Sequence, residues 1–217
     1  MQQQNLFGKK IIRSVSFDEQ EIIRDILYLH CNNSQIECDP TYSIGNFYKK
    51  GLTKPKYKFD LKPQVKDVVQ SCSTKLPLDD NSISVLMFDP PFMFGKHGKT
   101  DQNIMTKRFS MYDNWENLKW HYEKSLLEFS RVLKSKGILI FKCQDYTDSK
   151  TTLTHHYVYR WANEVGFYAK DLFILLSTGA IANKNLKQRH ARKYHSYFYV
   201  FQLAKEVQEL KGTQNPK

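Results

Sequence analysis

Residues 82–92 read Ser-Ile-Ser-Val-Leu-Met-Phe-Asp-Pro-Pro-Phe, a nearly continuous apolar run that stops at an acidic residue and two prolines. Such a run predicts a central strand of a parallel sheet, because both faces of that strand are covered by other elements. Pro90 and Pro91 end the strand, since neither residue can donate to the hydrogen-bond ladder. The stretch therefore predicts an α/β fold with Asp89 at the carboxyl end of a buried strand.

Strands and helices alternate on both sides of this run. A capping box at Ser16 and Glu19 predicts the start of a first helix, a cap at Asp113 predicts a second helix that Gly137 closes, and Gly166 ends a third. Further strands are expected at residues 35–38, 57–61, 68–71, 138–143, 171–176 and 197–203. This order predicts a Rossmann-like, doubly wound, mostly parallel sheet. The last strand follows its neighbour without a helix and should be antiparallel.

The connections in the first half of this sheet are short. Residues 39–57 and 61–68 leave little room for a helix, although parallel neighbours are usually joined by crossovers of about a dozen residues. The first half is therefore expected to be abbreviated, whereas the connections after residue 92 have full length.

Composition excludes several classes of protein. The chain has 217 residues, 41% hydrophobic and 14% aromatic, which is too apolar for a disordered polycation and fits one domain over 1–217 with polar tails at 1–13 and 205–217. The four cysteines form no C-x-x-C pair, so neither a metal site nor a disulfide framework is predicted. No apolar run is long enough for a membrane span and no secretory leader is seen, so a cytoplasmic protein is expected.

The formal net charge of +11 is concentrated in three segments. Residues 49–58, 96–108 and 183–195 carry net charges of +5, +3 and +5, which leaves −2 for the rest of the chain. Basic segments on a nearly neutral body favour a nucleic-acid partner, and solvated surface lysines are the alternative. Two of these segments, 49–58 and 96–108, are expected at the same sheet edge as Asp89. The candidate nucleic-acid-binding residues are Lys96, Lys99, Lys107, Arg108, Lys184, Lys187, Arg189, Arg192 and Lys193.

The group of four residues from Asp89 to Phe92 suits the binding of a planar base through its exocyclic amine. In open α/β sheets, ligands bind beyond the carboxyl ends of the strands. The Asp89 carboxylate and the Pro90 carbonyl offer two acceptors for the two N–H groups, and Pro91 stiffens the backbone. Phe92 offers a ring on which a base can stack. A proline turn that only ends the strand is the alternative. Gln144 and Asp145 either line this site or stabilise a turn.

The sequence from about residue 16 to 203 resembles the S-adenosylmethionine-dependent amino-methyltransferases, whose motif is Asp, Asn or Ser, then Pro-Pro, then an aromatic residue. Asp89, Pro90, Pro91 and Phe92 match that motif. The segment of residues 76–83 that leads into the motif strand is similar to the family pattern. Residues 131–141, which read Arg-Val-Leu-Lys-Ser-Lys-Gly and then an apolar run, resemble the family's helix and fifth strand.

The resemblance implies a class I methyltransferase fold and S-adenosylmethionine as cofactor. Residues 39–45 stand where the family has its cofactor loop, although they carry one glycine where the family has two. The resemblance further implies that an acid after the second strand binds the ribose hydroxyls and that residues after the third lie beside the adenine. The implied cofactor-binding residues are Phe17, Asp39, Pro40, Tyr42, Gly45, Asp60, Ser71 and Cys72.

The resulting prediction is methyl transfer to an exocyclic amino group of a nucleic-acid base, with adenine N6 in DNA favoured because Asp at the first motif position is common among adenine-N6 enzymes. A cytosine-N4 enzyme, an RNA base methyltransferase (ribosomal or transfer RNA), an inactive nucleic-acid-binding subunit and an α/β protein for a small metabolite are the alternatives. No separate target-recognition domain is visible, so a partner subunit or a second copy is a candidate source of sequence specificity.

Overall fold

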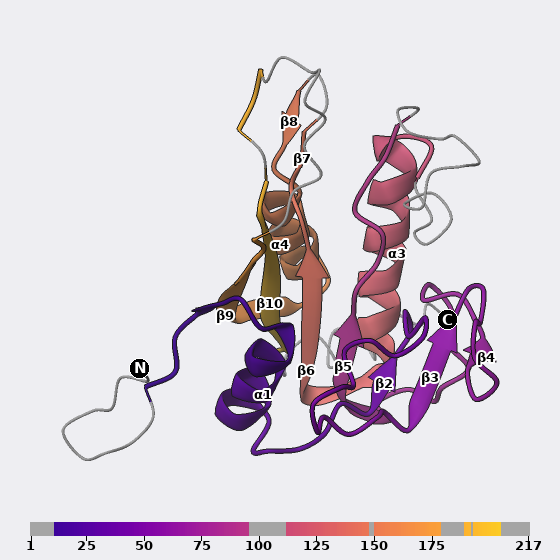
Figure 1. Cartoon of the computed structure of the whole chain (residues 1–217). Helices are drawn as coiled ribbons and strands as arrows, with labels where there is room; N and C mark the ends of the chain where they lie inside the picture. The colour runs from indigo at the N-terminus through magenta and orange to yellow at the C-terminus, as the bar shows by residue number, and fades with distance from the viewer. Residues whose placement is uncertain (1–10, 96–111, 148–149, 179–188, 192, 205–217) are drawn as a thin grey trace.

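The computed structural model describes residues 11–95, 112–147, 150–178, 189–191 and 193–204 (Figure 1). Among these residues, no helix combines the length and apolar character needed to cross a membrane. The elements in chain order are β1 (Val15–Ser16), α1 (Glu19–His30), β2 (Cys38–Asp39), β3 (Tyr57–Asp60), β4 (Val69–Gln70), β5 (Ile83–Phe88), α3 (Trp115–Val132), β6 (Leu133–Cys143), β7 (Tyr146–Thr147), β8 (Thr151–Thr152), α4 (Thr154–Glu164), β9 (Phe167–Leu176) and β10 (His195–Leu203).

The main sheet has the strand order β1-β9-β10-β6-β5-β2-β3-β4 within the described residues. Its pairs are parallel except those of β10, which runs antiparallel to both β6 and β9. The strand order reverses between β2 and β5, so the sheet is doubly wound. This arrangement confirms the predicted Rossmann-like sheet with an antiparallel last strand, the class I methyltransferase fold.

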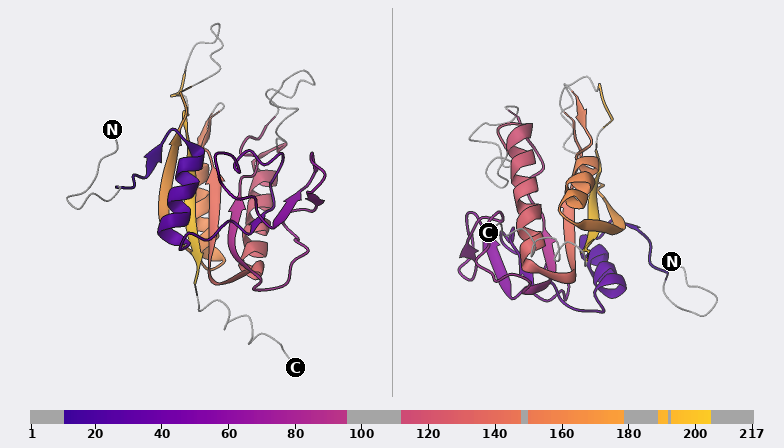
Figure 2. Two further views of the ribbon diagram at one scale, coloured as in Figure 1. Left: turned by 60° about the horizontal axis from the view of Figure 1, so that its bottom comes forward. Right: turned by 180° about the vertical axis from the view of Figure 1, so that it is seen from behind.

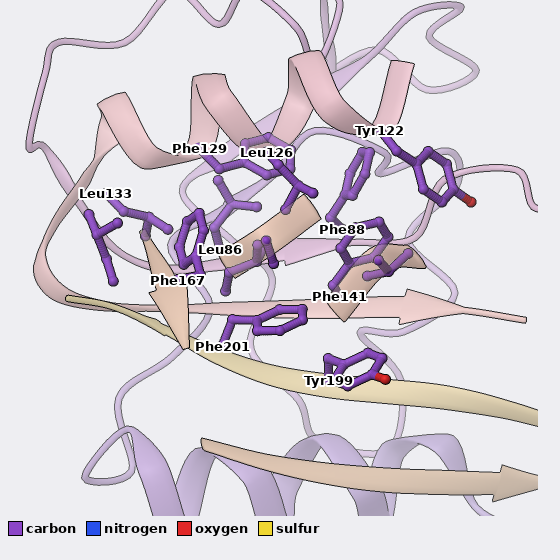
Figure 3. Close-up of a cluster of buried hydrophobic side chains, with 14 of the residues drawn as sticks. Leu86, Phe88, Tyr122, Leu126, Phe129, Leu133, Phe141, Phe167, Tyr199 and Phe201 are labelled. Carbon is purple, nitrogen blue, oxygen red and sulfur yellow. The ribbon is translucent and has the colours of Figure 1, made fainter. Parts of the chain in front are cut away.

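Alternate residues of the central strands β5 and β6 point to opposite faces of the sheet. Leu86, Phe88 and Phe141 pack against α3 and α4 in one cluster (Figure 3), whereas Met87 and Ile140 pack against α1 in a second cluster. Helix α1 therefore covers one face, and α3 and α4 cover the other (Figure 2). The burial of both faces of the sheet explains why the sequence of these strands is almost continuously apolar.

Three predicted helix ends are wrong. Helix α1 is capped by Asp18, whose carboxylate accepts from the backbone N–H groups of Gln20 and Glu21, while Ser16 belongs to β1. Helix α3 is capped by the Asn114 side chain and not by Asp113. Gly137 lies inside β6, because α3 ends at Val132 and the chain turns directly into the strand. At the two N-termini, a nearby residue of similar chemistry satisfies the terminal backbone groups.

The first half of the sheet is abbreviated, as predicted. Strands β2 and β4 have two residues each, and the described connections between β2, β3 and β4 contain no helix. Residues 40–56 form a series of turns that packs aromatic side chains onto the α1 face of the sheet, including Tyr42, Phe47 and Tyr48. This loop takes the place that a crossover helix would occupy.

Removing the ring of Phe129 should test the core that joins α3 to the sheet. Phe129 has 0% exposure and its ring lies 4.8 Å from that of Phe88, so Phe129→Ala should lower the free energy of unfolding by about 3–5 kcal/mol. Leu127 is 46% exposed on the same helix, and Leu127→Ala should cost less than about 1 kcal/mol. Urea unfolding measures both values, and equal costs would contradict this packing.

Candidate active site

Acidic and polar residues follow four neighbouring strands at one edge of the sheet. Asp39 ends β2, Asp60 ends β3, Ser71 follows β4 and Asp89 follows β5. These strands are parallel neighbours in the order β5-β2-β3-β4, so their carboxyl ends meet at the same edge. The edge lies at the top of the sheet in Figure 1, where β3, β5 and β6 point upward.

A chain of hydrogen bonds links the loop after β2 to the motif after β5. The hydroxyl of Thr41 donates to Asp39 Oδ1 over 3.2 Å and accepts from the backbone N–H of Asp89 over 2.9 Å. The backbone N–H of Thr41 donates to the same Asp39 oxygen over 2.9 Å. The segment expected to hold the cofactor and the segment expected to hold the substrate amine are therefore fixed to each other by one side chain.

The carboxyl group of Asp39 is fully buried, and both of its oxygens are bonded inside the protein. Its Oδ2 accepts from the Tyr48 hydroxyl over 2.8 Å, and the Tyr48 ring stacks on Tyr42 with 5.4 Å between centroids. Burial raises the pKa of Asp39 to about 7, although the hydrogen bonds from Tyr48 and Thr41 act in the opposite direction and lower it. Asp39 thus organises the loop of residues 39–48 from within.

Gly45 is fixed by the same loop. Its φ of +74° lies in the left-handed region, and a Cβ at this position would meet the Tyr42 hydroxyl at 2.5 Å. The loop therefore requires glycine here. Asp39, Pro40, Tyr42 and Gly45 are all buried.

Asp89 is half-buried and paired with a lysine. Its Oδ2 lies 3.4 Å from the Lys142 ammonium, which also lies 2.8 Å from Glu19 Oε2 at the start of α1. Burial raises the pKa of Asp89, and Lys142 opposes that shift. For Lys142, burial lowers the pKa but the two carboxylates outweigh it, so the pKa lies above its ordinary value.

The prolines of the motif are held against α3. Tyr122, which is fully buried, donates its hydroxyl to the carbonyl of Pro91 over 2.8 Å. Pro90 is buried, and Phe92 is half-buried beside it. The backbone that follows β5 is therefore fixed from the α3 side by Tyr122 and from the β2 side by Thr41.

The remaining expected cofactor residues lie along the same edge. Asp60 accepts from the backbone N–H groups of Ser43 and Lys62 over 2.9 and 2.8 Å, and its backbone carbonyl accepts from Ser71. Cys72 is half-buried next to Ser71. Phe17 is 67% exposed, directly before the cap of α1.

Sequence reasoning missed four side chains that organise this edge: Glu19, Thr41, Tyr122 and Lys142. Lys142 carried a readable signal, since it is the charged residue within the apolar run of residues 138–143. Its neighbours in the period-two pattern, Ile138 and Ile140, face the α1 side of the sheet. The other three side chains have no comparable pattern, because each has a partner that is distant in the sequence: Lys142 for Glu19, Asp89 for Thr41 and Pro91 for Tyr122.

Asp145 belongs to a polar cluster of its own just beyond β6. It is buried and accepts from Tyr197, and its Oδ1 lies 2.7 Å from the ring nitrogen of His155. Gln144 donates to the carbonyl of Lys193 over 3.4 Å. Asp145 thus binds β10 and α4, and Gln144 binds the loop before β10. These contacts agree with a structural role for the two residues at the turn after β6. Within the described residues, no group of three His, Cys, Asp or Glu could hold a metal ion.

The basic segments are only partly described. Lys96, Lys99, Lys107, Arg108, Lys184, Lys187 and Arg192 lie outside the described residues. Arg189 and Lys193 lie between β9 and β10, on the side where β9 ends, which is the carboxyl edge that carries Asp89. The expectation that residues 49–58 lie at this edge is wrong for the second half of the segment. Residues 54–56 lead into the opposite, amino end of β3, and residues 57–58 form that end.

Comparison with known proteins gives similarity at the level of solved structures alone. No protein-family model and no curated protein matches the sequence. A Thermus thermophilus protein provisionally assigned as a DNA modification methylase, solved with S-adenosyl-L-methionine, is 12% identical over 68% of this chain and 56% of its own, with a TM-score of 0.45.

Two further structures are similar to the same degree. A SAM-dependent methyltransferase from Methanosarcina mazei is 10% identical over 80% of this chain and 96% of its own, with a TM-score of 0.44. The PvuII cytosine-N4-specific DNA methyltransferase is 15% identical over 67% and 53%, with a TM-score of 0.46. The chain spans 55–57% of the length of the Thermus structures. The strand order of the sheet itself defines the fold.

The buried carboxyl of Asp39 should make stability depend on pH. Its folded pKa lies above its ordinary value, so the folded state binds the proton more tightly and the free energy of unfolding falls as pH rises from about 4 to 7. Asp39→Asn should reduce that fall by about 2–4 kcal/mol in urea unfolding across this range. In the exposed control Asp79→Asn, the free energy of unfolding should decrease with pH as in wild type. The same decrease in Asp39→Asn would contradict the prediction.

Proposed function

We propose that this protein transfers a methyl group from S-adenosylmethionine to an exocyclic amino group of a nucleic-acid base, with adenine N6 in DNA as the favoured target. The observation that carries the proposal is the Thr41 bridge, which joins the Asp89 motif to the loop after β2 at the carboxyl edge of a class I methyltransferase sheet. Substrate and cofactor must lie side by side for such a transfer, and this edge offers adjacent positions for both.

The residues along the edge suit this cofactor. The half-buried Asp60 is held by two backbone N–H groups, and each carboxylate oxygen keeps lone-pair capacity for a ribose hydroxyl. Ser71 and Cys72 follow β4 beside it, where an adenine ring would lie, and Phe17 offers an exposed ring. Asp39, Pro40, Tyr42 and Gly45 act through the shape of the loop, because they are buried. The cofactor, when bound, supplies a methyl group on a sulfonium.

Asp89, Pro90 and Phe92 would hold the base. The Asp89 carboxylate and the Pro90 carbonyl would accept the two N–H groups of the amine, which favours a tetrahedral nitrogen whose lone pair is released from the ring. Phe92 would stack on the base, worth about 1–3 kcal/mol. Tyr122 fixes the next carbonyl, that of Pro91, so the acceptor positions are set before the substrate arrives. A target base would reach this edge flipped or unpaired.

The choice of adenine over cytosine rests on the Asp at the first position of the motif, as the family resemblance implies. An RNA base methyltransferase would use the same acceptors. The basic residues Arg189 and Lys193 stand at the carboxyl edge and suit the phosphates of either polymer. A partner subunit or a second copy would add sequence specificity.

One observation favours a second candidate, an inactive nucleic-acid-binding subunit. Asp39 uses both carboxylate oxygens inside the loop, and Gly45 is required by Tyr42, so this loop offers a ligand less backbone freedom than a loop with paired glycines. Binding of S-adenosylmethionine distinguishes the two candidates. Isothermal calorimetry should show binding by the methyltransferase, and an absence of binding at millimolar cofactor would leave the inactive subunit.

Incubation with methyl-labelled S-adenosylmethionine and a panel of DNA and RNA, followed by nucleoside mass spectrometry, tests the proposal directly. The expected product is N6-methyladenine in DNA. Label in an RNA nucleoside would move the assignment to the RNA alternative. An absence of label in every polymer, with cofactor bound, would overturn the proposed function.

Asp89→Ala should lower methyl transfer at least about 100-fold, because a fixed partner of the amine is lost. The backbone N–H of residue 89 still reaches Thr41, so the calorimetric Kd for S-adenosylmethionine should change by less than about threefold. The exposed control Asp79→Ala should keep wild-type transfer. Full activity of Asp89→Ala would show that Asp89 has no role in methyl transfer.

Arg189 and Lys193 should contribute phosphate contacts. Replacing both with Gln should weaken nucleic-acid binding and reduce the slope of log K against log salt by up to about 0.9 for each lost contact. Lys134→Gln with Lys136→Gln removes two charges from the other end of β6 and serves as the matched control. Fluorescence anisotropy at several salt concentrations measures the slope. Equal slopes for the two double variants would show that Arg189 and Lys193 do not contact phosphates.

A further inference from the structure

Lys142 is a half-buried cation at the point where the motif meets α1. Its side chain is 17% exposed, and its ammonium lies 2.8 Å from Glu19 and 3.4 Å from Asp89. The rings of Phe47 and Phe198 lie 4.9 and 5.6 Å from the same ammonium. Two carboxylates and two ring faces therefore hold the charge in one position.

The register of the sheet explains why Lys142 and Asp89 meet. Met87 pairs with Ile140 in parallel strands, and both side chains face α1. Two residues further along each strand, Asp89 and Lys142 fall on that same face. Glu19 reaches the pair from the first turn of α1. The contact thus follows from strand pairing and does not depend on a surface loop.

Several titratable groups on the elements around Asp89 interact with it electrostatically. Glu19 comes from α1, Asp39 from the end of β2, Lys142 and Cys143 from β6, and Tyr122 from α3. Burial and Glu19 favour the protonated form of Asp89, and the positive charge of Lys142 opposes them. A protonated carboxyl has one acceptor oxygen fewer for an amine N–H.

We propose that Lys142 is a positioning residue for the proposed methyl transfer: its ammonium, anchored by Glu19, keeps Asp89 ionised and oriented to accept the substrate amine. The inference rests on the proposed function and adds a residue that the motif does not contain. Glu19 has the opposite effect on Asp89 through its own negative charge, so the two neighbours of Asp89 should change its titration in opposite directions.

The pH dependence of methyl transfer tests this role, because a purely structural lysine would scale the rate equally at every pH. In Lys142→Met the acid limb of the pH–rate profile should move to higher pH by at least about half a unit. In Lys142→Arg, which keeps the positive charge, the acid limb should lie close to its wild-type pH. Glu19→Gln should move it to lower pH. Lys134→Met, on the same strand, should leave it unchanged.

A second measurement separates this inference from the proposed function. The Asp89 carboxyl can be titrated by carbon-13 NMR, assigned with Asp89→Asn, in wild type, Lys142→Met and Glu19→Gln, with circular dichroism to confirm folding. Opposite shifts of the Asp89 pKa in the two variants support the role of Lys142 even if no polymer is methylated. If Lys142→Met is unfolded, Lys142→Arg and Glu19→Gln decide the question. An unchanged titration in the folded variants, with wild type active, would overturn the inference alone.

Discussion

The burial of β5 on both faces is the constraint on which this structure depends. Leu86 and Phe88 pack toward α3 and α4, and Val85 and Met87 pack toward α1. A strand covered in this way has no place for polar chemistry along its length, since an unpaired polar group there is costly. Polar residues are therefore found near its two ends, with the half-buried Ser84 near its start and Asp89 just past its last residue, where Asp89 meets the loop after β2. The hydrophobic core thus determines where polar side chains can gather at the edge of the sheet.

The first half of the sheet reaches the same edge with much less secondary structure. Strands β2, β3 and β4 contribute two, four and two residues, and an aromatic loop replaces helices on that side. The Tyr42 and Tyr48 stack, together with the Asp39 hydrogen bonds, supplies the rigidity that helix packing would otherwise give. A buried carboxyl in this position makes the loop sensitive to protonation as well as to packing.

The sequence was sufficient to predict the doubly wound sheet, its antiparallel last strand and the position of Asp89, because these follow from local patterns along the chain. The apolar run of residues 82–88 identified the central strand, and the absence of a helix before the last strand predicted its direction. Helix caps failed because Asp18 and Asn114 compete with Ser16 and Asp113 only a residue or two away. The Glu19–Lys142–Asp89 cluster could not be predicted, since it joins residues up to 123 positions apart whose contact depends on register. The roles of the site residues toward cofactor and base stay predictions.

The position of β10 also has a consequence for how the chain acquires its structure. This strand follows all other described strands of the sheet along the chain, yet it lies between β6 and β9 and pairs with both. Before it emerges from the ribosome, β6 has an open edge, and β9 together with β1 has no sheet to join. Such non-local pairing is slow and leaves hydrophobic edges exposed in the meantime. Pairing in the middle of the sheet is therefore expected to wait until β10 is available to join β6 to β9.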